Sequence, residues 1–167
     1  MSNGERVTFR EKVLPDDAQA VRAIVASSGF FYDHEIDVAV ELVDERLQKG
    51  LPSGYLFLFA EKQGRVVGYC CFGEIACTAG SYDLYWIAVH EEYRGQGIGK
   101  VLLKKCEEQI AALKGRCIWV ETSGQEKYRP TRDFYVHNEY QQEALLKDFY
   151  GPNDDKFIFV KRLAEHD

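Results

Sequence analysis

The segment that most constrains the fold covers residues 84–113, where an apolar run, a glycine-rich turn and a helical pattern follow one another directly. The turn reads Arg94-Gly95-Gln96-Gly97-Ile98-Gly99. Because its glycines carry no Cβ atom, successive backbone N–H groups can converge on one ligand oxygen. The first N–H groups of the next helix have no partner within the helix, and its dipole is positive there. The segment favours binding of a phosphate chain, although a tight connection alone would use the same glycines.

Length and charge narrow the class of protein. The chain has 167 residues and is 46% hydrophobic, which predicts one globular domain over residues 1–167. Its net charge of −6 argues against a nucleic-acid partner and is compatible with a cationic acceptor. The first twelve residues lack an apolar signal core, and no apolar stretch approaches the length of a membrane span. We therefore expect a cytoplasmic protein with no membrane partner.

The cysteines and histidines give no pattern typical of a metal site. Five cysteines, an odd number, lie in or beside apolar runs without C-x-x-C spacing: Cys70, Cys71, Cys77, Cys106 and Cys117. The four histidines are scattered along the chain. Zinc ligation requires clustered ligands, so we expect reduced core thiols, a reducing compartment and no bound metal.

Hydrophobic periodicity predicts an alternating order of strands and helices. Strands are expected at 7–14, 55–61, 65–73, 82–89, 117–121, 140–148 and 156–162, and helices at about 16–28, 35–49, 98–113 and 130–136. Gln63-Gly64 joins the second and third strands as a hairpin. The fourth strand is apolar on both faces apart from Asp83, which is typical of the middle of a sheet. With the following helix and the strand at 117–121 it makes a parallel crossover, so we predict a mixed α/β sheet with helices on both faces.

Two motifs in this order resemble the GNAT superfamily, the acyl-CoA-dependent N-acyltransferases. Residues 85–99 match its central motif, whose glycine pattern is R/Q-x-x-G-x-G/A. Phe134-Tyr135, followed by Tyr140, is similar to its second signature. The turn lacks the Lys-Ser/Thr of a nucleoside-triphosphate loop, and the first strand does not end in G-x-G-x-x-G. The resemblance covers nearly the whole chain and implies a mostly antiparallel sheet of about seven strands.

The resemblance also implies a cofactor site, with acetyl-CoA as cosubstrate and no metal. In the family the fourth strand splays from the fifth, and the thioester lies between them. The residues that correspond to the cofactor site are Ile87, Ala88, Val89, Arg94, Gly95, Gln96, Gly97, Ile98, Gly99 and Lys100. The loop amides would hold the pyrophosphate, and the backbone of Ile87 and Val89 would pair with pantetheine or polarise the thioester carbonyl. A lysine at a position such as Lys100 is more often part of a solvated helix surface.

The acid and the base are predicted from side-chain chemistry together with the resemblance. Tyr135 is the candidate acid, because a phenol stays protonated at neutral pH and can still protonate a departing thiolate. It would otherwise be an aromatic core residue. Asp83 is a candidate base, and Glu74 and Glu121 could serve equally well. Asp83 would otherwise bind a substrate cation or be an exposed charge, and a water relay would need no dedicated base.

One residue departs from the family pattern. The family has glycine before the aromatic residue that follows its tyrosine helix, whereas this chain has Glu139 before Tyr140. Either Asn138 takes the left-handed conformation, or the turn is built differently. The connection 122–129 is also longer than usual in the family, so the acceptor side is not inferred from relatives.

We therefore expect an N-acyltransferase that moves an acetyl group to a primary amine by direct attack in a ternary complex. The acceptor would be a small molecule or a peptide, and exposed edge strands make a homodimer possible. Two other classes stay open. One is an acyl-CoA-binding sensor or scaffold without turnover, and the other is an interaction protein without a nucleotide site.

Overall fold

The chain forms strands and helices in the order that the sequence patterns predict. The computed structural model describes residues 6–165. Its elements are β1 (Thr8–Arg10), α1 (Asp17–Ser27), α2 (Asp33–Lys49), β2 (Leu56–Lys62), β3 (Arg65–Glu74), β4 (Ser81–Val89), α3 (Ile98–Ala112), β5 (Cys117–Ser123), α4 (Arg129–His137), β6 (Gln141–Gly151) and β7 (Asp154–Arg162). Short 3-10 turns, η1 (Leu51–Ser53), η2 (Glu91–Tyr93) and η3 (Glu126–Tyr128), lie between them.

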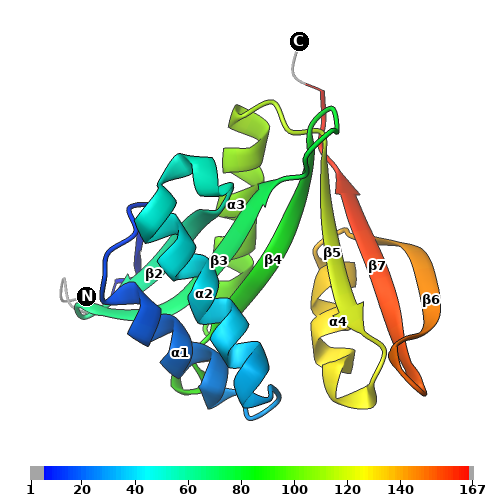
Figure 1. Cartoon of the computed structure of the whole chain (residues 1–167), viewed down its shortest axis with the longest axis horizontal. Coiled ribbons are helices and arrows are strands. Elements are labelled where there is room, and N and C mark those ends of the chain that lie inside the picture. The colour runs from blue at the N-terminus through cyan, green and yellow to red at the C-terminus, as the bar shows by residue number, and fades with distance from the viewer. Residues whose placement is uncertain (1–5, 166–167) are drawn as a thin grey trace. The chain divides into compact units, whose positions relative to one another are not determined.

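The strands form a seven-stranded sheet in the order β1-β2-β3-β4-β5-β7-β6 (Figure 1). β4 pairs with β5 in parallel, and the pairs β1–β2, β2–β3, β5–β7 and β6–β7 are antiparallel. This confirms the predicted mixed, mostly antiparallel sheet, the parallel crossover and the central place of β4. The hairpin between β2 and β3 turns at Gln63 and Gly64, whose φ angles are 52° and 77°.

The chain groups into two compact units. The first unit comprises Met1–Gly73 and Trp86–Glu108, and the second comprises Glu74–Tyr85 and Gln109–Asp167. The boundary runs through β4 and through α3, so both elements contribute residues to each unit. The prediction of one domain over the whole chain stays a prediction.

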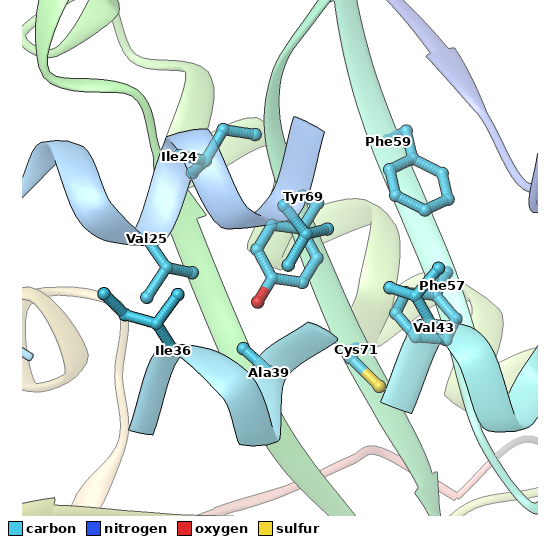
Figure 2. Packing of buried hydrophobic residues seen from close by; sticks show 10 residues of the cluster. Ile24, Val25, Ile36, Ala39, Val43, Phe57, Phe59, Tyr69 and Cys71 are labelled. Atoms are coloured by element: carbon cyan, nitrogen blue, oxygen red, sulfur yellow. The ribbon is translucent and has the colours of Figure 1, made fainter. Parts of the chain in front are cut away.

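The core of the first unit lies between α1, α2 and strands β2 and β3 (Figure 2). Its buried members are Val21, Ile24, Val25, Ile36, Ala39, Val43, Phe57, Phe59, Tyr69 and Cys71. Because side chains alternate along a strand, Gly68 and Cys70 of β3 face the other way. There Cys70 contacts Cys106 of α3, and a Cβ on Gly68 would lie 3.2 Å from the Leu102 side chain. Helices therefore cover both faces of this part of the sheet, as predicted.

Two sequence expectations about local structure are wrong. β1 covers Thr8–Arg10 instead of Val7–Leu14. The chain turns after Arg10, and the Arg10 side chain and the Leu14 backbone N–H then donate to Asp17 of α1. The Leu14 N–H donates to the Asp17 carboxylate over 2.7 Å, which removes it from any strand ladder. Cys77 is exposed in the turn before β4, whereas Cys70, Cys71 and Cys106 are buried thiols as expected.

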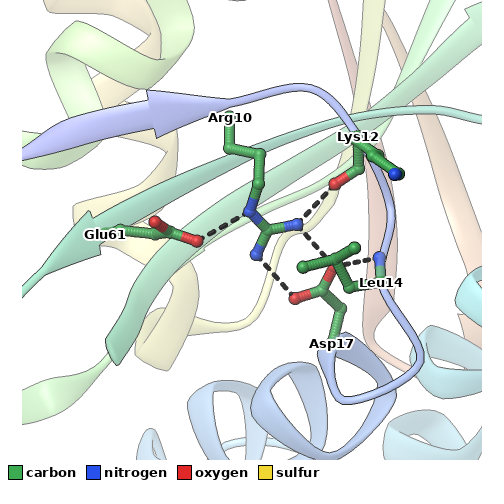
Figure 3. A network of polar contacts seen from close by, with 5 residues as sticks. All are labelled: Arg10, Lys12, Leu14, Asp17 and Glu61. Atoms are coloured by element: carbon green, nitrogen blue, oxygen red, sulfur yellow. Dashed lines mark hydrogen bonds and ion pairs between the residues drawn. The ribbon is translucent and has the colours of Figure 1, made fainter. Parts of the chain in front are cut away.

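Arg10 ties β1 to both α1 and β2 (Figure 3). Its guanidinium donates two hydrogen bonds of 2.8 Å to the Asp17 carboxylate and one of 2.6 Å to Glu61. It also donates to the Lys12 carbonyl and lies 4.8 Å from the centre of the Phe59 ring. The Asp17 side chain is only 3% exposed, so removal of either partner would leave a buried polar group without its ion pair. The hydrogen bonds to Asp17 are the main reason that the pKa of Arg10 is raised.

We expect Asp17→Asn to lower the free energy of unfolding by about 3 kcal/mol, because a two-point ion pair is lost from a buried site. The matched control is Asp37→Asn, since Asp37 pairs with Arg22 over 3.0 Å but both side chains are at least half exposed. That variant should change stability by less than about 1 kcal/mol. Urea unfolding measures both changes. Equal losses of stability in the two variants would show that burial does not make the Asp17 ion pair more important than the exposed one.

Candidate functional site

The glycine-rich turn opens α3 and is shaped to receive a ligand. Gly95 and Gly97 have φ angles of 75° and 78°, which residues other than glycine rarely adopt. A Cβ on either residue would meet no heavy atom within 4 Å, so open space lies beside both. Alternating conformations of this kind turn successive N–H groups to one side, and α3 begins directly afterwards at Ile98. Such an arrangement is suited to binding an anion such as a phosphate group.

Positively charged side chains surround this turn. Lys62, at the end of β2, donates to the Gln96 side chain over 3.1 Å and lies 5.9 Å from the centre of the Tyr93 ring. Arg94 donates from Nε to the Val89 carbonyl over 3.4 Å. Lys100 is exposed in the first turn of α3. The sequence analysis missed Lys62, because the hairpin that brings it to the turn is distant in the chain.

The pairing of β4 with β5 is short. It covers only Ser81–Asp83 of β4, although β4 continues to Val89 and β5 continues to Ser123. The register joins Ser81, Tyr82 and Asp83 to Cys117, Ile118 and Trp119. Farther along β4, Ile87, Ala88 and Val89 are half-buried. This is the stretch whose backbone is predicted to contact the pantetheine arm.

In the second unit, β5 and β7 present two different faces. Val120 and Thr122 are buried, and their partners Phe159 and Phe157 in β7 contact α4 through Tyr135 and Arg132. Glu121 lies on the opposite face, with Ile158 beside it in the register. Lys156 reaches Glu121 there, with Nζ 2.8 Å from Oε2. We call the face that carries Glu121 and Lys156 the acidic face.

Asp83 joins this cluster from β4. It lies beside Trp119 in the register and is half-buried. Burial raises the pKa of Asp83, Glu121 raises it further, and Lys156 lowers it. Two of the three predicted base candidates are therefore close enough to interact. Glu74 is exposed at the end of β3, and its field adds to burial in raising the pKa of Tyr82.

A bulge in β6 adds aromatic side chains to the acidic face. Leu146 pairs with Lys156 and Gly151 pairs with Asp154, so residues 147–150 project out of the ladder. The Phe149 ring centre is 4.1 Å from Lys156 Nζ. Burial, followed by the charges of Glu121 and Asp154 and by Tyr128, raises the pKa of Tyr150 to about 12. The sequence pattern predicts a regular strand followed by a turn that begins at Gly151, so it does not predict this bulge.

Tyr135 lies on α4 and is buried among aromatic rings. Its ring centre is 5.5 Å from those of Phe134 and Tyr140 and 6.0 Å from that of Phe159. Only 4% of the residue is exposed. The packing is that of an aromatic core residue, and the role of its hydroxyl group as an acid stays a prediction.

The turn after α4 is built at Glu139. Glu139 has a φ angle of 71°, whereas Asn138 has φ −97° and ψ 23°. Of the two alternatives left open by the sequence, the second holds: the turn is built differently, with a left-handed glutamate where the family pattern has glycine. Asn138 instead closes the helix, because its side chain donates to the Phe134 carbonyl over 2.7 Å.

Between residues 6 and 165, no group of three or more His, Cys, Asp or Glu side chains is arranged to hold a metal ion. Over the same residues, no helix has both the length and the apolar character needed to cross a lipid bilayer.

Comparisons with known proteins agree with this geometry. Residues 53–142 match the family model described as an acetyltransferase (GNAT) domain. A solved GNAT-family acetyltransferase from Desulfovibrio desulfuricans, itself described as putative in function, is 46% identical, with a TM-score of 0.94 over 95% of this chain and all of that chain. An uncharacterized N-acetyltransferase of Methanocaldococcus jannaschii is 27% identical over 79% of this chain and 88% of its own length. The PaiA N-acetyltransferase of Thermoplasma acidophilum, solved in complex with coenzyme A, shares the fold at 19% identity, with a TM-score of 0.72 over 95% of this chain and 99% of its own.

Glu139→Gly should raise the free energy of unfolding by about 1 kcal/mol, because it removes the cost of a left-handed glutamate. Asn138→Gly is the matched control at the neighbouring position, where φ is ordinary and the side chain makes a hydrogen bond. It should lower stability by about 1 kcal/mol. Urea unfolding of both variants measures the difference. A stabilised Asn138→Gly together with a destabilised Glu139→Gly would show that the turn is built at the other residue.

Proposed function

We propose that this chain, which belongs to the GNAT family of acetyltransferases, moves an acetyl group from acetyl-CoA to a primary amine by direct attack in a ternary complex. Family membership follows from a family model that matches more than half of the chain and from 46% identity to a GNAT structure over nearly its whole length. The observation that carries the proposal is the pair of left-handed glycines at the start of α3, with open space beside them. Acetyl-CoA is the expected cosubstrate, since a relative of this fold was solved with coenzyme A.

The cofactor would be held by backbone groups and by nearby cations. The N–H groups from Arg94 to Gly99 and the first turn of α3 supply donors for the pyrophosphate. Lys62 and Lys100 add positive charge near these donors. Backbone groups of Ile87 and Val89 would pair with the pantetheine amides. When bound, the cosubstrate supplies a thioester whose carbonyl carbon accepts the amine.

Proton transfer would be divided between two side chains. Asp83 would take a proton from the substrate ammonium, because its half-buried site favours the protonated carboxyl group. The neutral amine then forms the C–N bond, its second proton leaves to solvent, and the C–S bond breaks. Tyr135 would donate its phenolic proton to the departing sulfur and be reprotonated from solvent. One proton is released overall when the amine enters as an ammonium ion.

The acceptor and the assembly are the finer parts of the proposal. The carboxylates of the acidic face favour a cationic amine, either a small molecule or a peptide. β6 is an edge strand and most of its residues are exposed, which is the basis for the proposed homodimer. The cytoplasmic location stays a prediction.

The function is tested with the protein, coenzyme A and a panel of amines. Calorimetry should detect coenzyme A binding, and acetyl-CoA should release free thiol with at least one polyamine, amino acid, aminoglycoside or peptide amine. Gly95→Val should weaken binding about tenfold, or about 1.4 kcal/mol, because a β-branched residue cannot adopt this φ without strain. Gly29→Val is the control, since Gly29 has a φ angle of 71° outside the turn. Binding without thiol release would support a non-catalytic sensor, and no binding would overturn both functions.

For the acid, the informative variant is Tyr135→Phe, which keeps the ring in its aromatic cluster and removes only the hydroxyl group. If that group protonates the thiolate, kcat should fall about 10²- to 10⁴-fold. The affinity for coenzyme A should stay close to the native value, because the cofactor contacts are unchanged. Steady-state kinetics and calorimetry measure the two quantities. Full turnover in this variant would leave Tyr135 as a core residue and remove the acid assignment.

A further inference from the structure

The acidic face contains a lysine for which no role has been given. Lys156 is buried, with only 11% of its side chain exposed, although lysine is rarely buried unless it is paired. On the same strand, Lys161 lies on the opposite face, where it donates to the Asn138 carbonyl over 3.2 Å. The two lysines of β7 therefore occupy different environments. Of these two lysines, Lys156 is the one that shares its face with Asp83 and Glu121.

The strand register explains how Lys156 reaches Glu121. Ser123 pairs with Lys156 and Glu121 pairs with Ile158, so Glu121 and Lys156 are diagonal neighbours on one face. The ion pair of 2.8 Å is one contact of the ammonium group. The Phe149 ring, carried by the β6 bulge, is another at 4.1 Å. Lys156 is thus fixed between a carboxylate and an aromatic ring.

The titratable groups that interact with one another on the acidic face come from five elements. They are Asp83 of β4, Glu121 of β5, Tyr128 of η3, Tyr150 of β6, and Asp154 and Lys156 of β7. Lys156 is the cation of this set. It opposes the effect of Glu121 on Asp83, and burial of Asp83 adds to the effect of Glu121. The two carboxylates therefore have different surroundings, since one is bound to a lysine and the other is desolvated.

We propose that Lys156 is a positioning residue that holds Glu121 in an ion pair and thereby leaves proton exchange with the amine to Asp83. The inference rests on the proposed base role of Asp83. Glu121 Oε2 is held by the Lys156 ammonium group at 2.8 Å, whereas Asp83 is half-buried and subject to the opposing charges of both residues. The proton passes from the amine nitrogen to an Asp83 oxygen and then to solvent. A pair of carboxyl groups in unequal environments is a recurring way to divide such roles.

The experiment follows the Asp83 carboxyl carbon by NMR as pH is varied, in the protein without ligands. Asp83→Asn identifies the signal, because it deletes it. Lys156→Met should move the titration midpoint of Asp83 up by about one pH unit, since a nearby positive charge is lost. Lys156→Arg should restore it. Glu121→Gln should move the midpoint in the opposite direction, to lower pH, because a negative charge is lost and Lys156 is released.

Lys161→Met is the matched control, since it removes a paired lysine from the other face of the same strand. It should leave the Asp83 midpoint unchanged. With the most reactive amine of the panel, the acid limb of kcat/KM should shift as the midpoint does. An unmoved midpoint in Lys156→Met, in an enzyme that still turns over, would overturn the inference and leave the proposed function intact. If Lys156→Met does not fold, an upward shift or no shift in Glu121→Gln would overturn it instead. Failure of turnover with every amine would remove the base role itself.

Discussion

The early end of the pairing between β4 and β5 is the constraint on which the proposed chemistry depends. Backbone N–H and C=O groups in a strand require partners, and a continuous ladder to β5 would use those of residues 84–89. The β4 residues that pair with β5 are Ser81, Tyr82 and Asp83. In the proposed function, a ligand with its own amide groups would pair with backbone groups farther along β4. If the backbone groups of Ile87 and Val89 make the proposed contacts, side-chain identity at these positions says little about binding.

Several local departures from ordinary backbone preference lie among the residues that function is expected to use. Gly95 and Gly97 are left-handed at the proposed phosphate site, and Glu139 is left-handed directly after the helix that carries Tyr135. The β6 bulge, which contains the left-handed Asp148, carries Phe149 to Lys156. Such conformations cost free energy and persist where surrounding structure requires them. An unfavourable feature also lies away from the proposed site. The buried Tyr69 hydroxyl group has no hydrogen-bond partner and points among Val25, Ile36 and Ala39 in the core (Figure 2).

Features encoded by neighbouring residues could be predicted from the sequence, and features that depend on strand register could not. The hairpin at Gln63-Gly64, the start of α3 at Ile98 and the central place of β4 follow from local patterns, and the structure confirms them. The predicted length of β1 was wrong because Arg10 and Asp17 redirect the chain through side-chain hydrogen bonds. Lys62 and Lys156 were missed for a related reason. A lysine in a strand pattern looks solvated until the fold shows which distant carboxylate, amide or ring it meets.

The difference between Asp83 and Glu121 shows why composition alone does not assign a base. Both are single carboxylates in strands, and their sequence contexts do not rank them. In the fold, Glu121 is half exposed and bound to Lys156, whereas Asp83 is half-buried and subject to opposing charges. Desolvation favours the protonated form of a carboxyl group. A group that must accept a proton and release it again is served by such an environment, and this is the reason for proposing Asp83 as the base.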